Sequence, residues 1–303
     1  MSERRAALPS PLKALRRQPR PRRARGVAAR ILFLVLCACA FVSPATGSPP
    51  FQQSEPTPLQ REIEIQRARL SSSDQEERRD AVTRLGALAR PEGSRAAAAA
   101  LGDTSAVVRA TAARAVLSLG PGEAATLLVP LLRDRDEFVR REVAYALGRA
   151  RSPLAVDALT VALETDKDAS VRGAAAVALG QIGDAGAVPA LAGAISRRLQ
   201  APGFFNRLRR RKIEEDEFVR RASATALGLL KSREGVPVLI AALSNEQTPD
   251  DVRREAAQAL GLIGDPSAIP ALRAALDARD PYLSRIAFEA LRKLDPANST
   301  RPT

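Results

Sequence analysis

Histidine and cysteine, the side chains that most often ligate transition metals or act as bases and nucleophiles near neutral pH, are almost missing from this chain. There is no histidine, and the only cysteines, Cys37 and Cys39, lie in an N-terminal apolar run. A mature chain that has neither histidine nor cysteine cannot build a Cys/His zinc site, a thiol nucleophile, a Ser-His-Asp triad or a two-histidine iron site. We therefore predict no metal site, no cofactor site and no enzymatic activity of these kinds.

The other sequence patterns that could indicate catalysis are not convincing either. Gly120-Pro121-Gly122 followed by Ala125 matches a degenerate dinucleotide-binding fingerprint. It stands between two expected helices, whereas the fingerprint requires a strand and a helix, so we interpret it as a turn. Carboxylates are abundant, but most stand at expected helix starts or on solvated faces. No acid/base pair stands out among them, and we predict no catalytic residue.

Arginine recurs along the chain at a nearly constant spacing. Arg78, Arg109, Arg140, Arg172, Arg220, Arg253 and Arg285 are separated by 31, 31, 32, 48, 33 and 32 residues. These arginines could line a surface for an anionic ligand, or they could form Arg–Asp contacts between repeats. The fixed position beside a helix-start aspartate favours the structural interpretation. The predicted structural ladder consists of Arg109, Arg140, Arg172, Arg220, Arg253, Asp136, Asp168, Asp216 and Asp250.

The single long interval, between Arg172 and Arg220, contains a basic insertion at residues 197–212. Insertions between repeats usually form loops, and such loops often carry function. This one is expected to bind a partner with two aromatic and five cationic side chains: Phe204, Phe205, Arg207, Arg209, Arg210, Arg211 and Lys212. Rings that insert and charges that steer suit an acidic protein or an anionic membrane. The alternative is a solvated basic loop, partly neutralised by the four acids at residues 214–217.

The elements that would position these residues are short helices in pairs. A glycine stands eight residues after most of the arginines, and we expect it to end a first helix (Gly86, Gly148, Gly180, Gly228 and Gly261). Proline and then leucine follow in a second helix, and both helices carry apolar residues at helical spacing. One such pair cannot bury its own apolar face, so neighbouring pairs must stack. We predict an all-α, right-handed α-solenoid of about six two-helix repeats plus a terminal half-repeat over residues 73–295.

Around this array we predict four flanking segments: a signal peptide at 1–47, a linker at 48–56, a capping helix at 57–72 and a flexible tail at 296–303. Thr57-Pro58-Leu59-Gln60 supplies a capping box and a proline at the first helical position. The second repeat departs from the pattern, because Leu117 replaces the expected glycine and Gly120 follows three residues later. We expect its turn to be shifted.

The pattern Asp-x-x-Val-Arg, Ala-x-Ala-Leu-Gly and Pro-x-Leu resembles the short HEAT-like repeats of the phycobilisome-lyase type. The resemblance implies an armadillo-type α-solenoid, but it says little about function, because such repeats occur in chromophore lyases, in deoxyhypusine hydroxylase and in many adaptors. Deoxyhypusine hydroxylase holds iron through repeated His-Glu pairs, and this chain has no histidine to supply them. That activity is excluded, whereas a lyase or chaperone-like subunit for a prosthetic group remains the alternative.

The N-terminus has the order of residues that is typical of a secretory signal. A basic stretch ends at Arg30, residues 31–42 are uncharged and mostly apolar, and small residues follow. Twelve residues are short for a membrane span, so cleavage after Ala45 or Gly47 is expected. Lipidation of Cys39 and an uncleaved anchor are the alternatives. We predict export to the periplasm or cell surface.

The net charge of +13 is concentrated in two segments. Residues 1–47 hold ten bases against one acid, and residues 197–212 hold seven bases and no acid, which leaves a net −3 for the rest. A nearly neutral repeat body argues against a general groove for nucleic acid. We predict a non-catalytic protein–protein interaction scaffold with a protein partner. A nucleic-acid or anionic-membrane binder that acts through the insertion ranks third, and a small-molecule substrate is disfavoured.

Overall fold

The computed structural model describes residues 55–200, 203 and 212–296. The predicted signal peptide, residues 48–54 of the predicted linker and residues 297–303 of the predicted tail lie outside the described residues. The described part is all-α apart from one short β-hairpin base. None of its helices is both long and apolar enough to cross a bilayer.

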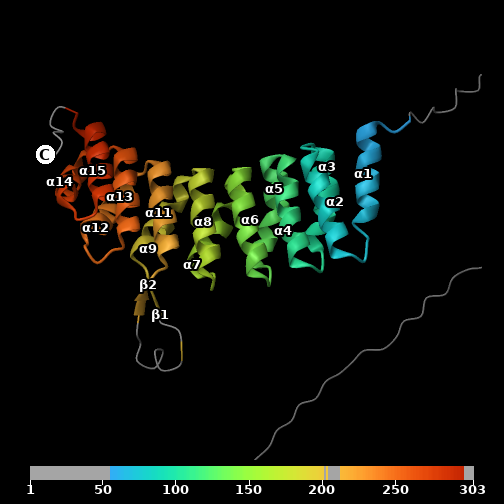
Figure 1. The fold of residues 1–303 in the computed structure, drawn as a ribbon, viewed down its shortest axis with the longest axis horizontal. Helices are drawn as coiled ribbons and strands as arrows, with labels where there is room; N and C mark the ends of the chain where they lie inside the picture. Colours follow the sequence, from blue (N-terminus) through green and yellow to red (C-terminus); the bar gives the residue numbers. More distant parts are fainter. Residues whose placement is uncertain (1–54, 201–202, 204–211, 297–303) are drawn as a thin grey trace, which may run out of the picture. The chain divides into compact units, whose positions relative to one another are not determined.

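The helices alternate between a first and a second helix of each repeat (Figure 1). The first helices are α2 (Gln75–Ala87), α4 (Ala106–Ala115), α6 (Glu137–Ala150), α8 (Ala169–Ile182), α11 (Glu217–Leu230) and α13 (Asp250–Ile263). The second helices are α3 (Pro91–Ala97), α5 (Pro121–Leu128), α7 (Val156–Thr165), α9 (Val188–Ser196), α12 (Val236–Ser244) and α14 (Ile269–Ala274). Six pairs and a terminal half-repeat, α15 (Pro281–Leu294), therefore match the predicted solenoid.

Short 3₁₀ turns join these helices or extend them. They are η1 (Ala98–Gly102), η2 (Val116–Ser118), η3 (Val129–Arg133), η4 (Pro153–Ala155), η5 (Ala185–Ala187), η6 (Arg233–Gly235), η7 (Pro266–Ala268) and η8 (Ala275–Asp277). At the N-terminal end stands α1 (Pro58–Arg69), and the expected capping box is present there between Thr57 and Gln60. Helix α1 packs on α2 and α3, so it covers the first repeat.

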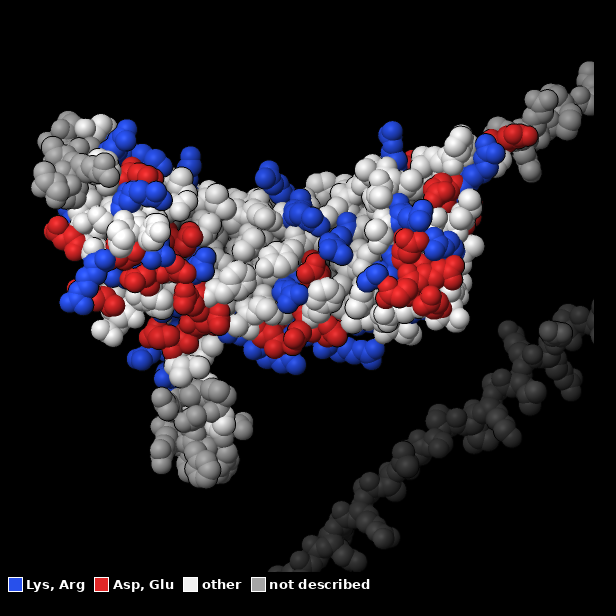
Figure 2. Space-filling view, in the orientation of Figure 1, with Lys and Arg blue, Asp and Glu red and all other residues white. Residues whose placement is uncertain are grey.

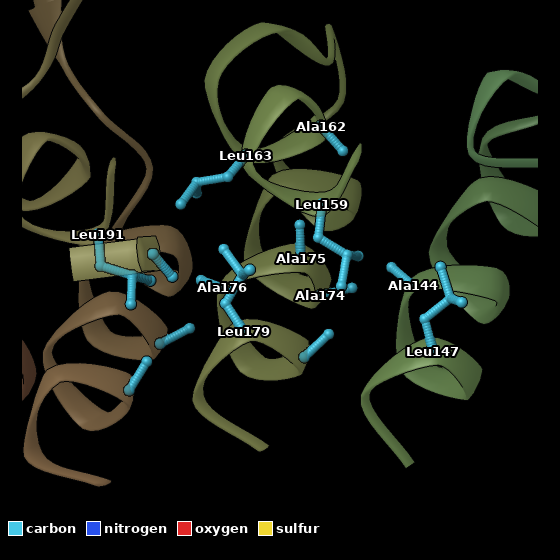
Figure 3. Packing of buried hydrophobic residues seen from close by; sticks show 14 of the residues in the cluster. Ala144, Leu147, Leu159, Ala162, Leu163, Ala174, Ala175, Ala176, Leu179 and Leu191 are labelled. Carbon is cyan, nitrogen blue, oxygen red and sulfur yellow. The ribbon is translucent and has the colours of Figure 1, made fainter. Parts of the chain in front are cut away.

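Each first helix packs on the first helices of the neighbouring repeats, from α2 through α15, and on a second helix. The shared core consists almost entirely of alanine, leucine and valine. Helix α8, with neighbours on several sides, buries Ala174, Ala175 and Ala176 completely. Figure 3 shows these small side chains among leucines of the surrounding helices. Small residues let the helix axes approach closely, which explains a core without tryptophan.

The recurring glycines do not end the first helices, contrary to the prediction. Helix α6 continues to Ala150, two residues past Gly148, and α8 and α13 likewise continue past their glycines. The residue in the left-handed conformation that follows each helix stands three positions after the glycine, at Ala89, Arg151, Gly183, Lys231 and Gly264. The glycines are needed for a close approach instead. A Cβ on Gly228 would lie 2.9 Å from the Cα of Ala259 in the next first helix.

Candidate partner-binding site

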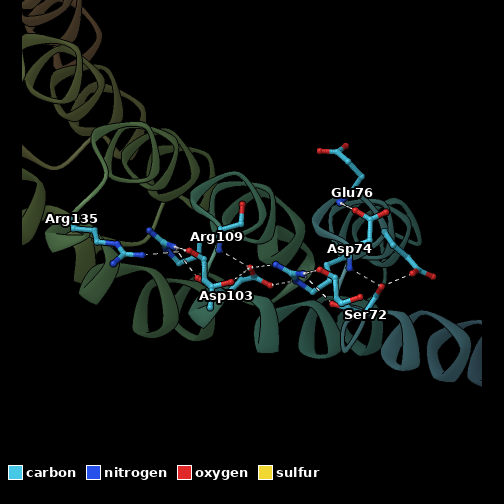
Figure 4. Close-up of polar contacts among 11 residues, drawn as sticks. Ser72, Asp74, Glu76, Asp103, Arg109 and Arg135 are labelled. Atoms are coloured by element: carbon cyan, nitrogen blue, oxygen red, sulfur yellow. Dashed lines mark hydrogen bonds and ion pairs between the residues drawn. The ribbon is translucent and has the colours of Figure 1, made fainter.

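The arginines of the first repeats form a chain of largely buried ion pairs. Figure 4 shows Arg109 beside Asp103, which stands in the loop before its helix. Arg109 donates from Nε and Nη2 to both carboxylate oxygens of Asp134, at 2.8 and 2.7 Å. Its Nη1 donates to the backbone carbonyl of Asp103 at 2.8 Å. Arg109 therefore ties the loop before its own helix to the loop before the next first helix. Arg78 binds Asp103, and Arg140 binds Asp166, in the same bidentate way.

The carboxylate partners differ from those predicted. Asp134 and Asp166 stand two residues before the helix-start aspartates Asp136 and Asp168, which were the expected partners. The physical reason lies in the loop before each first helix, where the N–H groups of Asp136 and Asp168 donate to Asp134 and Asp166 and hold these carboxylates beside the arginine of the preceding repeat. Asp136 accepts from the N–H of Phe138, and only Asp168, which makes no capping bond, reaches a ladder arginine of the preceding repeat, Arg140, at 2.6 Å.

The second half of the predicted ladder is irregular. Arg220 donates to the carbonyl of Ile195 at 3.0 Å and lies 3.3 Å from Glu214. Arg253 donates to the carbonyl of Leu243 and lies 3.5 Å from Asp250 of its own helix. Asp216 caps α11 by accepting from the N–H of Phe218. These arginines are therefore held by contacts with their own surroundings.

The ladder has an electrostatic consequence at low pH. The hydrogen bond from Arg78 holds the pKa of the Asp103 carboxyl below its ordinary value. Burial alone would raise the pKa of Asp134, but the hydrogen bonds from Arg109 and from the backbone of Asp136 outweigh it and lower that pKa. Both carboxylates must therefore be protonated before their ion pairs are lost.

We expect the free energy of unfolding to be steady near neutral pH and to fall below about pH 4. A carboxylate whose pKa is lowered by folding stabilises the protein above its unfolded-state pKa of about 3.9, and this stabilisation disappears as the pH drops through the folded-state pKa. Urea denaturation at pH 6 and pH 3 measures the effect. The variant Asp103→Asn should show a smaller difference between the two pH values. Equal stability of the wild type at both pH values would contradict the expectation.

The insertion begins and ends in a β-ladder, not in a plain loop as predicted. Strand β1 (Arg198–Gln200) pairs antiparallel with β2 (Lys212–Glu214), and the N–H of Glu215 donates to the carbonyl of Arg197 at 2.9 Å. The preceding helix α9 ends at Ser196, directly before the insertion.

Glu215 fixes this hairpin to the solenoid. Its side chain is fully buried and accepts from Nη2 and Nε of Arg172, at 2.6 and 3.1 Å. Arg197 lies 3.4 Å from the same carboxylate and donates to the carbonyl of Leu163 at 2.8 Å. Glu215 thus takes the place that Asp134 and Asp166 hold in earlier repeats. Sequence reasoning grouped it with the four acids at residues 214–217 that partly neutralise the basic loop, although its position directly before the helix-start Asp216 was a usable signal.

Of the predicted partner-binding residues, the structure places only Lys212, which is exposed at the start of β2. Phe204, Phe205, Arg207, Arg209, Arg210 and Arg211 lie outside the described residues. The described residues contain no group of three or more Asp, Glu or Cys side chains that could hold a metal ion. Over the described array, Figure 2 shows acidic and basic side chains interspersed with uncharged surface.

Two-helix repeats that stack through a shared core define an α-solenoid. The chain belongs to the HEAT-repeat family, because the sequence model of HEAT repeats matches residues 64–148, 125–198 and 201–292. Comparison with curated protein sequences found no significant match.

Several solved structures are similar in fold. The Escherichia coli protein YibA is 21% identical, with a TM-score of 0.53, over 78% of this chain and 81% of YibA. The complex of CpcE and CpcF of phycocyanin lyase from Nostoc sp. PCC7120 is 23% identical, with a TM-score of 0.46, over 85% of this chain and 93% of that chain. Human deoxyhypusine hydroxylase is 21% identical, with a TM-score of 0.37, over 78% of this chain and 96% of that chain.

Proposed function

We propose that this chain is a non-catalytic binding scaffold that presents its hairpin to a protein partner. The observation that carries the proposal is the buried Glu215, which joins Arg172 and Arg197 and so fixes the base of the insertion within the ladder. Solenoids offer extended surfaces for binding, and a firmly attached arm on such a surface lowers the entropy cost of recognition. Similarity of fold alone does not carry the lyase alternative to this chain.

The partner surface that fits the insertion best is acidic. The tip sequence combines Phe204 and Phe205 with four arginines between residues 207 and 211. Rings of this kind anchor an interface, and the cations accelerate and orient the encounter with an acidic protein. An anionic membrane is the alternative surface for the same residues, and the binding experiment below distinguishes the two.

We expect replacement of residues 201–211 by an Asn-Gly turn to leave the fold intact and to weaken partner binding at least tenfold. The replacement keeps β1, β2 and Glu215, whereas deletion of residues 197–212 would also remove Arg197 and its contacts with the solenoid. The matched control exchanges Phe204 and Phe205 for serine without changing the charge. Two kinds of binding are measured side by side at two salt concentrations. One is the capture of protein partners from envelope extracts, and the other is binding to vesicles in which about 30% of the lipid is anionic phosphatidylserine.

If the turn variant captures protein partners as well as the wild type does, the proposal that the hairpin binds a protein partner is wrong. Binding that is lost only for vesicles would assign the tip to a membrane. Circular dichroism and thermal melting show whether the variant is folded, so a loss of binding through unfolding is recognised directly.

The proposal includes export from the cytoplasm. It is supported by the order of residues in the first 47 positions, which lie outside the described residues. Sequencing the N-terminus of the native protein should find a start at Thr46 or Ser48, and a start at Met1 in a cytoplasmic fraction would contradict export.

A further inference from the structure

A groove of about 940 Å³ lies between η3 and the second helix α7. Its walls are mainly apolar and include Val129, Leu132 and Ala158. Val161, near the middle of α7, is 53% exposed to solvent although it is a large aliphatic side chain. Two other grooves among the described residues measure about 420 and 470 Å³.

The irregular second repeat opens this groove. The second helices α9 and α12 each contain one proline, near their start (Pro189 and Pro237). The second helix of the second repeat also starts with a proline, Pro121, but a further proline, Pro130, follows it, and α5 ends at Leu128 and continues as the 3₁₀ turn η3. A 3₁₀ turn follows a different path from an α-helix because it winds more tightly. As a result α7 meets η3, whereas α9 packs directly on α7 and α12 packs directly on α9.

The charges around the groove fall into two groups. Asp134, Arg140 and Asp166 lie deep in it and are occupied by ladder contacts. Arg133 and Lys167 lie at the end of the groove near the C-terminus of α7, and Asp157 lies at the other end. All three are exposed, and none forms an ion pair with another described residue. The groove is therefore apolar along its length, carries opposite charges at its two ends and is open to solvent.

We propose that this groove binds a short amphipathic helix of a protein partner that lies antiparallel to α7. The partner helix places acidic side chains at its N-terminus against Arg133 and Lys167, and a basic side chain at its C-terminus against Asp157. This arrangement also satisfies the dipole of the partner helix, which favours acids at the N-terminus and bases at the C-terminus. Apolar side chains three and four residues apart fill the groove beside Val161. The inference rests on the proposed scaffold function and adds a second contact to it.

Charge complementarity selects this occupant over others. A polyanion would meet Asp157 at one end of the groove and an apolar wall along its length, so it matches only half of the site. The ten residues of α7 span about 15 Å, which corresponds to about three turns of a helix. A helix of this length can contact both ends of the groove at once.

The experiment uses a fluorescein-labelled synthetic helix with two glutamates in its first turn, leucines at positions i, i+4 and i+7, and two lysines in its last turn. Fluorescence anisotropy measures its binding to the whole protein. We expect the double variant Arg133→Glu, Lys167→Glu and the single variant Val161→Asp each to weaken binding at least tenfold. A second peptide, with lysines exchanged for the N-terminal glutamates, should bind the double variant more tightly than the wild type.

The matched control is Ala241→Asp, which introduces the same charge at the exposed position of α12 that corresponds to Val161. It should leave peptide binding unchanged, as should the turn replacement of residues 201–211. Equal affinities of all variants for both peptides would overturn the proposed groove, while the tip experiment still decides the hairpin. A wild-type dimer in sedimentation that Val161→Asp converts to a monomer would also overturn it, because the occupant would then be a second copy.

Discussion

Replacing Glu215 by alanine should lower the free energy of unfolding by about 3–5 kcal/mol, the cost typical of removing one partner from a buried ion pair. The side chain is completely buried and satisfies Arg172, which is itself buried, as well as Arg197. Without the carboxylate, both guanidinium groups lose a charged acceptor in a region that water reaches poorly. The hairpin base also loses the contact that joins it to α8, so we expect local opening of β1 and β2 before the solenoid unfolds.

Glu217→Ala is the matched control, because Glu217 stands two residues later and is exposed. An acid in the first turn of a helix contributes about 0.3–1 kcal/mol, so this variant should be nearly as stable as the wild type. Guanidinium denaturation followed by circular dichroism measures both variants, and hydrogen exchange at residues 197–200 and 212–216 reports local opening. A loss below about 1 kcal/mol for Glu215→Ala, within the range of exposed pairs, would show that the carboxylate is not the anchor.

The repeat fold was predictable because its signals are local. Helical spacing of alanine and leucine, aspartates at helix starts and an arginine recurring every 31 to 33 residues are all visible without knowing any contact. The number of helical pairs followed directly from these marks. The shifted turn of the second repeat was also visible, since Leu117 and Gly120 break the pattern, and the structure gives α4 an early end at Ala115.

Contacts between repeats were harder to predict, since residues at the same spacing can contact different neighbours. The partner of Arg109 lies 25 residues away at Asp134, only two residues from the aspartate that sequence periodicity suggested. Periodicity places a residue in a repeat, but it does not decide which of two nearby carboxylates turns towards an arginine. The groove beside α7 could not be predicted from the sequence for a related reason. Its width depends on how far the path of η3 departs from that of an ideal α-helix, and the residue types alone do not determine that distance.

The glycines show most directly where a sequence signal was misassigned. A glycine near the end of a helical pattern is usually a C-cap, where it adopts the left-handed conformation. Here that conformation occurs three residues later and is adopted at several repeats by another residue, such as Arg151 and Lys231. What requires glycine is the distance between helices, because the first helices of neighbouring repeats meet backbone to backbone. A helix-ending signal and a helix-crossing signal look the same in a single sequence.

Gly228→Ala should therefore destabilise the protein by about 1–3 kcal/mol, the usual cost of overpacking a core, even though alanine is the better helix former. The new Cβ would lie 2.9 Å from the Cα and 3.0 Å from the Cβ of Ala259, so α11 and α13 would have to move apart. Thermal melting and urea denaturation measure the loss.

Gly193→Ala is the matched control for Gly228→Ala, and we expect it to have the opposite effect on stability. Gly193 lies inside α9, is exposed, and a Cβ there would meet no atom within 4 Å. Only the lower conformational entropy of the unfolded chain and the higher helix propensity of alanine then count, so stability should rise by about 0.5–1 kcal/mol. If both variants are stabilised, the helices do not meet as closely as the structure places them, and Gly228 would be a helix-end residue after all. If both are destabilised, α9 must contact something at Gly193 that lies outside the described residues.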